Sequence, residues 1–223
     1  MKREIYRIRL GICNCYLIKE DGLILIDAGS PKHGQRFLKA LGRLSINPKA
    51  ISLLIITHCH FDHIGSANEI REITRCKVAI NKEEKDWAEQ ARKIIPPTVG
   101  LWGKVVEKVT RILMSRVKLA PTPIDLVLEE EFSLKPYGIG GRVFCTPGHS
   151  PGSMSVLLDS GEAFVGDLAV NGSLMRKGPG LPLFVEDIAT LKESWQLLLD
   201  KGAKQFFPAH GAPFGAEKAA KFK

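Results

Sequence analysis

The stretch Thr57-His58-Cys59-His60-Phe61-Asp62-His63 places four potential metal ligands within six positions. It follows directly on Ile51-Ser52-Leu53-Leu54-Ile55-Ile56, a run typical of a strand that is apolar on both faces because helices cover its sheet. Alternation puts His58 and His60 on one side and Cys59 on the other, while the turn that follows lets Asp62 and His63 reach a neighbouring point. The pattern predicts a site for two metal ions rather than one.

Chance is a poor explanation of this pattern. The chain has only 6 histidines in 223 residues. A match to His-x-His-x-Asp-His is expected about twice in ten thousand chains of such composition. The alternative is a polar turn that binds no metal. In that case four clustered side chains would be desolvated without a partner to compensate them.

The rest of the chain alternates between strand and helix patterns without a linker or repeat, which predicts one domain over residues 1–223. Periodicity predicts helices near residues 37–44 and 188–201, the second beginning at Asp187 and ending at Gly202. The expected class is α/β (α+β), with sheets at the centre and helices outside. Further strands are expected at residues 4–10, 13–19, 22–26, 77–80, 142–145, 153–158, 162–165 and 204–207.

The histidine motif is similar to the signature of the metallo-β-lactamase superfamily, and other segments resemble its remaining elements in the same order. These segments are Leu25-Ile26-Asp27-Ala28-Gly29, Thr146-Pro147-Gly148-His149-Ser150, Phe164-Val165-Gly166-Asp167 and Phe207-Pro208-Ala209-His210-Gly211. The resemblance implies a four-layer αββα sandwich. It also implies that one ion is held by His58, His60 and His149, that the other is held by Asp62, His63 and His210, and that Asp167 touches both.

The same resemblance assigns Asp27 no ligand role, so we expect it to support a histidine or a turn. His33 falls outside the motif and is expected to take no part. Arg176 and Lys177 follow the bridging aspartate closely enough to contact an anionic group of a substrate, although solvated surface charge is the alternative.

Two neighbouring cations lower the pKa of a water between them, so the expected chemistry is hydrolysis, with Asp62 as a candidate proton shuttle. Imidazole with carboxylate favours zinc, and manganese or iron fits the same ligands. The ligand pattern resembles that of glyoxalase II-like thioesterases and lactonases, which implies an activated acyl substrate. Persulfide dioxygenase and nucleic-acid phosphodiesterase are the alternatives. Antibiotic cleavage is disfavoured, because many β-lactamases of this fold carry cysteine or serine in the place of Asp167.

Positive charge is concentrated in residues 91–120, which hold seven basic residues against Glu107 alone, a local balance of +6 within a net +8. This segment interrupts the fold between ligand motifs and predicts a helical insertion. Val105, Val109, Ile112 and Leu113 would form its apolar face. We expect either a lid over the site that contacts an amphiphilic acyl substrate, or a packed helix with a solvated basic face or a homodimer contact.

The N-terminal ten residues lack the apolar core of a signal peptide, and no segment has membrane-spanning length. Five cysteines, an odd number, indicate reduced thiols, with Cys13 and Cys15 an inert buried pair. We therefore expect a cytoplasmic protein that acts on a small, anionic or amphiphilic molecule rather than on nucleic acid.

Overall fold

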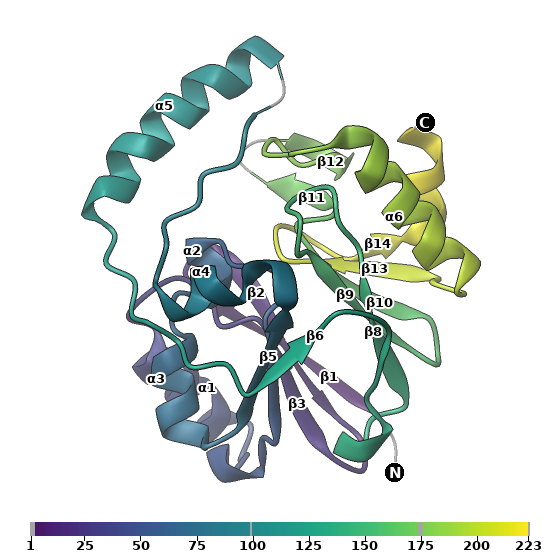
Figure 1. Ribbon diagram of the computed structural model, residues 1–223. Helices are drawn as coiled ribbons and strands as arrows, with labels where there is room; N and C mark the ends of the chain where they lie inside the picture. Colours follow the sequence, from purple (N-terminus) through teal and green to yellow (C-terminus); the bar gives the residue numbers. More distant parts are fainter. Residues whose placement is uncertain (1–2, 99, 174–175, 223) are drawn as a thin grey trace.

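Two six-stranded sheets form the centre of the molecule in a computed structural model that describes residues 3–98, 100–173 and 176–222 (Figure 1). The first sheet contains, in spatial order, β1 (Glu4–Leu10), β2 (Cys13–Lys19), β3 (Leu23–Ile26), β4 (Leu53–Ile55), β5 (Lys77–Asn81) and β6 (Leu126–Leu128). The second contains β14 (Phe214–Gly215), β13 (Gln205–Pro208), β10 (Glu162–Gly166), β9 (Met154–Leu158), β8 (Gly141–Cys145) and β7 (Phe132–Ser133). A separate ribbon pairs β11 (Val170–Ser173) with β12 (Arg176–Gly180).

Helices lie on the outer faces of these sheets (Figure 1). The α-helices are α1 (Gly34–Arg43), α2 (Phe61–Ile64), α3 (Ala67–Thr74), α4 (Lys85–Glu89), α5 (Gly100–Arg116) and α6 (Ile188–Asp200). Short 3-10 helices are η1 (Pro48–Ala50), η2 (Lys82–Glu84), η3 (Lys135–Tyr137) and η4 (Ala216–Phe222). As expected, Asp187 caps α6, its side chain accepting from the backbone N–H groups of Ala189 and Thr190.

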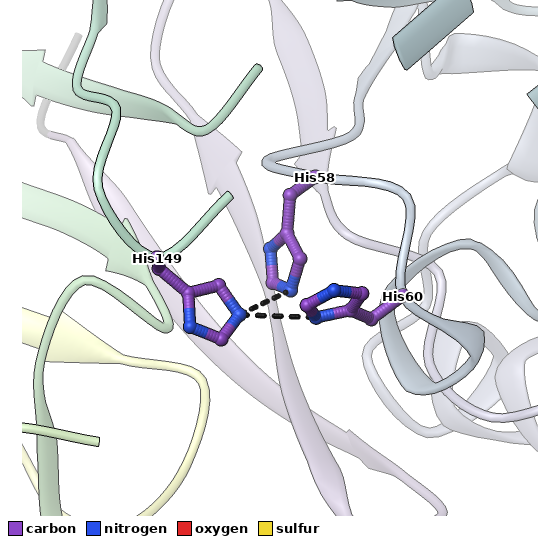
Figure 2. A group of neighbouring side chains, drawn as sticks. All are labelled: His58, His60 and His149. Carbon is purple, nitrogen blue, oxygen red and sulfur yellow. Dashed lines mark hydrogen bonds between the residues drawn. The ribbon is translucent and has the colours of Figure 1, made fainter. Parts of the chain in front are cut away.

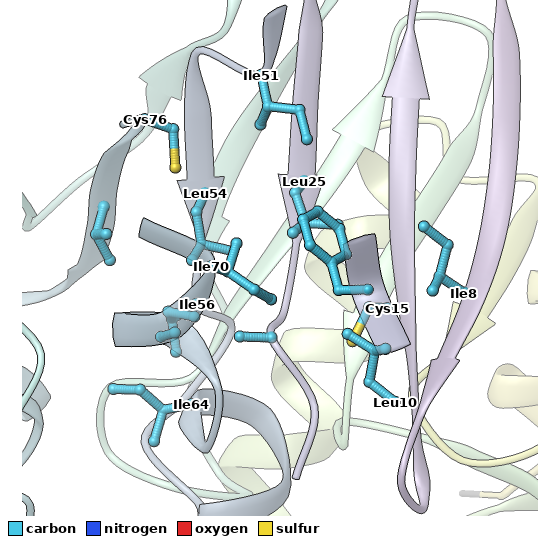
Figure 3. Close-up of a cluster of buried hydrophobic side chains, with 14 of the residues drawn as sticks. Ile8, Leu10, Cys15, Leu25, Ile51, Leu54, Ile56, Ile64, Ile70 and Cys76 are labelled. Atoms are coloured by element: carbon cyan, nitrogen blue, oxygen red, sulfur yellow. The ribbon is translucent and has the colours of Figure 1, made fainter. Parts of the chain in front are cut away.

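Three buried apolar layers show why the chain needs four layers of secondary structure. Along β3, Leu25 packs with α1 and α3 in the cluster of Figure 3, while Ile24 and Ile26 face the second sheet. A third layer packs the far face of the second sheet against Leu191, Trp195 and Leu198 of α6. The expected αββα sandwich is therefore confirmed, and the wholly buried strands explain the continuous apolar runs in the sequence.

The carboxyl ends of several strands meet at one edge of the sandwich. β3, β4 and β5 are parallel to one another, and β10 is parallel to β13, so the loops after β4, β10 and β13 converge. The loop that joins β8 to β9 arrives at the same place, where Met154 N–H bonds to the carbonyl of Thr57. These loops carry the predicted ligands.

The segment 91–120 does contain a helix, but its predicted apolar face is not the buried one. Figure 1 shows α5 joined to the sandwich by extended segments. Val105, Val109, Ile112 and Leu113 are between 51% and 58% exposed. Met114 is buried instead, because the helix meets the rest of the protein along a neighbouring stripe. In the part of the chain that the structure describes, no helix has both the length and the apolar character to cross a bilayer.

Candidate metal centre

The first group of ligand atoms comes from two loops. His58 and His60 leave the end of β4, and His149 lies between β8 and β9. The Nε2 atom of His149 lies 3.1 Å from Nε2 of His58 and 3.0 Å from Nδ1 of His60, and Figure 2 shows the three rings pointing toward one another. The Nδ1 atom of His149 is 2.7 Å from the carbonyl of Phe184, which can only accept a hydrogen bond. The ring proton is therefore on Nδ1, and Nε2 has a free lone pair. All three rings are buried.

The second group lies beside the first and brings together Asp62, His63 and His210. The Nε2 atom of His210 is 3.2 Å from Oδ2 of Asp62 and 3.3 Å from Oδ1 of Asp167. The Nε2 atom of His63 is 3.4 Å from the same Oδ1. Asp62 and His63 reach this point from α2, a short helix where the sequence suggested only a turn.

Asp167, directly after β10, connects the two groups. Its Oδ1 faces His63 and His210, while its Oδ2 lies 3.8 Å from Nε2 of His149. Its position gives one carboxylate oxygen to each group, which is the arrangement that a ligand shared by two ions requires.

Buried polar atoms without partners fit this donor set to metal ions. His60 Nε2, His63 Nε2 and Asp167 Oδ1 are buried and have no hydrogen bond among the described residues. An unsatisfied buried polar atom costs about 1–3 kcal/mol, and several in one place call for a compensating partner. Five imidazoles and two carboxylates are suited to divalent transition metals.

The environment fixes the protonation of these rings. Burial lowers the pKa of His58 well below its ordinary value and that of His60 to about 3, and nearby imidazoles act in the same direction. Burial opposes protonation of His63 and His210 as well. There, however, neighbouring acidic groups raise the pKa of both rings well above the usual range, chiefly Cys13 and Asp27 for His63 and Asp167 for His210. The first group therefore offers free lone pairs, whereas the imidazoles of the second group favour their protonated form.

Asp27 lies behind the second group, where the sequence suggested a supporting residue. Its Oδ2 is 2.9 Å from Nδ1 of His63, and its Oδ1 accepts from the backbone N–H of Thr57 at 2.8 Å. The backbone of Asp27 has a φ of 61°, a left-handed conformation that is uncommon outside glycine and clusters at functional sites.

Glu84 is a buried residue that sequence reasoning missed. Its carboxylate accepts hydrogen bonds from Cys59 N–H, the Ser150 hydroxyl and Gly152 N–H, the last at 3.1 Å. It thereby joins the loop of His58 and His60 to the loop of His149. Burial raises its pKa, and these hydrogen bonds oppose the rise. The run Lys82-Glu83-Glu84-Lys85 carries no spacing that separates this glutamate from solvated charge.

The remaining predicted residues are not ligands of the two groups. His33 is the residue before α1 and belongs to neither ligand group, and its Nδ1 is 2.9 Å from the carbonyl of Pro31. Arg176 and Lys177 belong to β12, but their side chains lie outside the described residues, so their role stays a prediction. Cys13 and Cys15 are buried free thiols whose pKa is raised by burial. Cys15 is away from the ligands, but Cys13 lies against the second group, with its Sγ 4.0 Å from Nδ1 of His63, so the expectation of an inert pair does not hold for Cys13.

A cavity of about 960 Å³ opens onto the metal centre. Asp62, Asp167 and His210 line its polar part. Helix α5 and the stretches on either side of it provide much of the remaining wall: Thr110, Leu113 and Met114 belong to the helix, and Ile94, Ile95, Pro96 and Val117 flank it. The helical insertion therefore lines the site, as a lid would, but Leu113 is the only member of its predicted apolar face to do so.

Two sheets between helices, with buried histidine and aspartate clusters at the strand ends, define a metal-binding hydrolase fold. The model of the metallo-beta-lactamase superfamily matches residues 8–210, and the chain belongs to this superfamily.

Relatives and solved structures agree with this assignment. The probable metallo-hydrolase YqgX of Bacillus subtilis is 28% identical over 73% of this chain and 65% of its own length. The probable metallo-hydrolase MJ0888 of Methanocaldococcus jannaschii is 29% identical over 89% of this chain and 87% of its own. The N-acyl homoserine lactonase of Bacillus cereus is 22% identical over 73% and 64%, respectively. The crystal structure of TTHA1623 in a di-iron-bound form is 27% identical, with a TM-score of 0.70 over 98% of each chain.

Proposed function

We propose that this protein is a binuclear metallo-hydrolase that cleaves an activated acyl compound, a thioester or a lactone. The observation that carries the proposal is the position of Asp167 between two convergent ligand groups, at the floor of a cavity with largely apolar walls. Such walls suit an acyl chain, and the polar floor suits the bond to be cleaved.

Two divalent ions, when bound, supply water of lowered pKa and polarise the substrate carbonyl. Asp62 lines the cavity beside His210, so its carboxylate is placed to accept the proton of the attacking water and to pass it to the leaving group. The hydrogen bond of His149 to Phe184 and the contact of His63 with Asp27 hold these rings in one orientation. Apolar residues such as Leu113 and Val117 exclude bulk water around the acyl chain.

Sequence similarity supports the acyl class, because one relative is named an N-acyl homoserine lactonase. We propose zinc as the metal on the basis of ligand chemistry. Iron is the second candidate, since the similar TTHA1623 has been crystallised in a di-iron-bound form. We further propose that the chain acts as one domain in the cytoplasm.

The test is a hydrolysis panel on metal-loaded protein, with a thioester, a lactone, a phosphodiester and a cephalosporin. The proposal predicts turnover of the thioester or the lactone, lost in His149→Ala and kept in the control His33→Ala, a histidine outside both ligand groups. Turnover of the phosphodiester alone would instead support the alternative function, a nucleic-acid phosphodiesterase. Equal activity in the two variants would show that the reaction does not depend on the metal centre.

A further inference from the structure

A second cavity, of about 650 Å³, lies between β1 and α1 and carries only positive charge. We call it the basic groove, and its charged lining residues are Arg7, Arg9, Arg36, Lys39 and Arg43. The other lining residues are Ile5, Tyr6, Ile8, Ala40 and Leu44, so no carboxylate takes part.

The basic groove is a product of regular structure rather than of scattered surface charge. Arg7 and Arg9 are two positions apart on β1, a spacing that puts both on one face of a strand. The three cations of α1 follow at intervals of three and four residues, the spacing of one helical face. Tyr16 and Asn14 of β2 stand opposite Arg7 and Arg9, so these two arginines leave the face of β1 that points away from α1. Because β1 is the edge strand of its sheet, both rows still line the groove that runs along this edge beside α1.

These five cations have no ion pair among the described residues. Arg9 makes one polar contact, from its Nε to the carbonyl of Gly11 at 3.3 Å. Glu4 of β1 is engaged by Lys19, and α1 contains no acidic residue. Like charges at such spacings repel one another, so the groove attracts a ligand with several negative charges.

The basic groove and the cavity at the metal ligands share two lining residues. Arg7 and Arg9 line both the groove and the cavity that contains Asp62, Asp167 and His210. A molecule long enough to reach from one to the other would place its anionic end on the five cations and its reactive bond at the metal ligands.

We propose that the basic groove binds the phosphates of an acyl carrier, so that the substrate class is a thioester of a phosphorylated thiol, as in coenzyme A thioesters. This deepens the proposed function and rests on it. The apolar walls near α5 take the acyl chain, the metal ligands take the thioester, and the arginines and lysine take the phosphates. A nucleic-acid strand suits the groove less well. Its only aromatic side chain, Tyr6, is bonded to Glu4, whereas sites for single strands present aromatic rings for stacking.

The experiment measures binding of free coenzyme A and hydrolysis of two thioesters, an acyl-coenzyme A and an acyl-N-acetylcysteamine that has no phosphate. The groove variant is Arg36→Gln with Lys39→Gln and Arg43→Gln. The control Lys49→Gln with Lys77→Gln and Lys135→Gln removes equal charge from exposed positions outside both cavities.

The proposal predicts that the groove variant weakens coenzyme A binding and raises KM for acyl-coenzyme A by at least about tenfold. Its KM for the phosphate-free thioester should stay within about twofold of wild type, because substrate parts that do not reach the groove are unaffected. Equal Kd values for the groove variant and the control would overturn it. So would tighter binding of a single-stranded RNA than of coenzyme A at matched ionic strength.

The two proposals fail separately. If coenzyme A binds in a groove-dependent manner but neither thioester is hydrolysed, the groove stands and the proposed reaction is wrong. If only the phosphate-free thioester is hydrolysed, with no binding of coenzyme A, the reaction stands and the groove assignment is wrong.

Discussion

Asp27 Oδ2 lies 2.9 Å from Nδ1 of His63, and this contact directs the opposite ring nitrogen toward Asp167. The other oxygen of Asp27 accepts from the N–H and the hydroxyl of Thr57, the residue before His58. A single carboxylate therefore contacts a ligand of the second group and the residue that precedes a ligand of the first.

Replacing this carboxylate tests that relationship. Asp27→Asn keeps an oxygen for Thr57 but loses the charge that holds the His63 ring, so we expect metal affinity to fall about 10–100-fold. Competition with a chromophoric chelator measures the change, with Asp86→Asn, an exposed carboxylate of α4, as the matched control. Unchanged affinity in Asp27→Asn would mean that the contact has no role in metal binding.

Metal uptake should depend on pH differently at the two ligand groups. The pKa of His58 and His60 is lowered by burial, so these rings carry no proton to be displaced at neutral pH. The pKa of His63 and His210 is raised above the ordinary imidazole value of 6.5, so a metal must displace protons there, and affinity falls as pH falls through the raised values. Calorimetric titration in buffers of different ionisation enthalpy should detect proton release with one equivalent of metal only. The same release with both equivalents would contradict this assignment.

Glu84 should act as a brace between the two ligand loops. Glu84→Ala leaves Cys59 N–H, the Ser150 hydroxyl and Gly152 N–H without their acceptor, and we expect a loss of about 2–5 kcal/mol in the free energy of unfolding. Denaturant titration of the metal-saturated protein measures it. Glu83→Ala, the exposed neighbour, is the control, and equal stability of the two variants would argue against a brace.

Two adjacent residues of α5 are almost equally exposed, but only one of them lines the cavity. Leu113 lines the cavity, whereas Ile112 has a nearly equal exposed fraction but does not line it. We expect Leu113→Ser to raise KM for a long-chain acyl substrate by about five- to tenfold, because apolar contact with the chain is lost, and Ile112→Ser to leave KM unchanged. Steady-state kinetics on one substrate series decides, and matching values for the two variants would exclude α5 from substrate binding.

The ligand cluster was predictable from the sequence because chemistry and strand pattern coincide there. His58 and His60 follow a buried strand. Buried polar side chains need a compensating partner, and a metal ion is the partner that suits several histidines together. Strand ends far apart in sequence were harder to relate: Asp167 and His210 could be placed beside that motif only through the family resemblance, whereas the parallel pairing of β10 with β13 brings them together physically.

Other features depend on packing that no local pattern encodes. Glu84 looks like surface charge until the loops close over it. The basic groove draws on two segments that are unremarkable alone and become one site because α1 packs on β1. The apolar stripe of α5 was misassigned because Met114 and Val117 offer a neighbouring stripe, and the choice between stripes is made by the rest of the fold.

Metal content per chain, measured by mass spectrometry after saturation and removal of free metal, tests the proposed binuclear centre most directly. We expect about two ions in wild type and in His33→Ala, and about one in His149→Ala and in His210→Ala, since each of these loses a ligand of one group. A single ion in saturated wild type, or two ions retained in both His149→Ala and His210→Ala, would contradict the account.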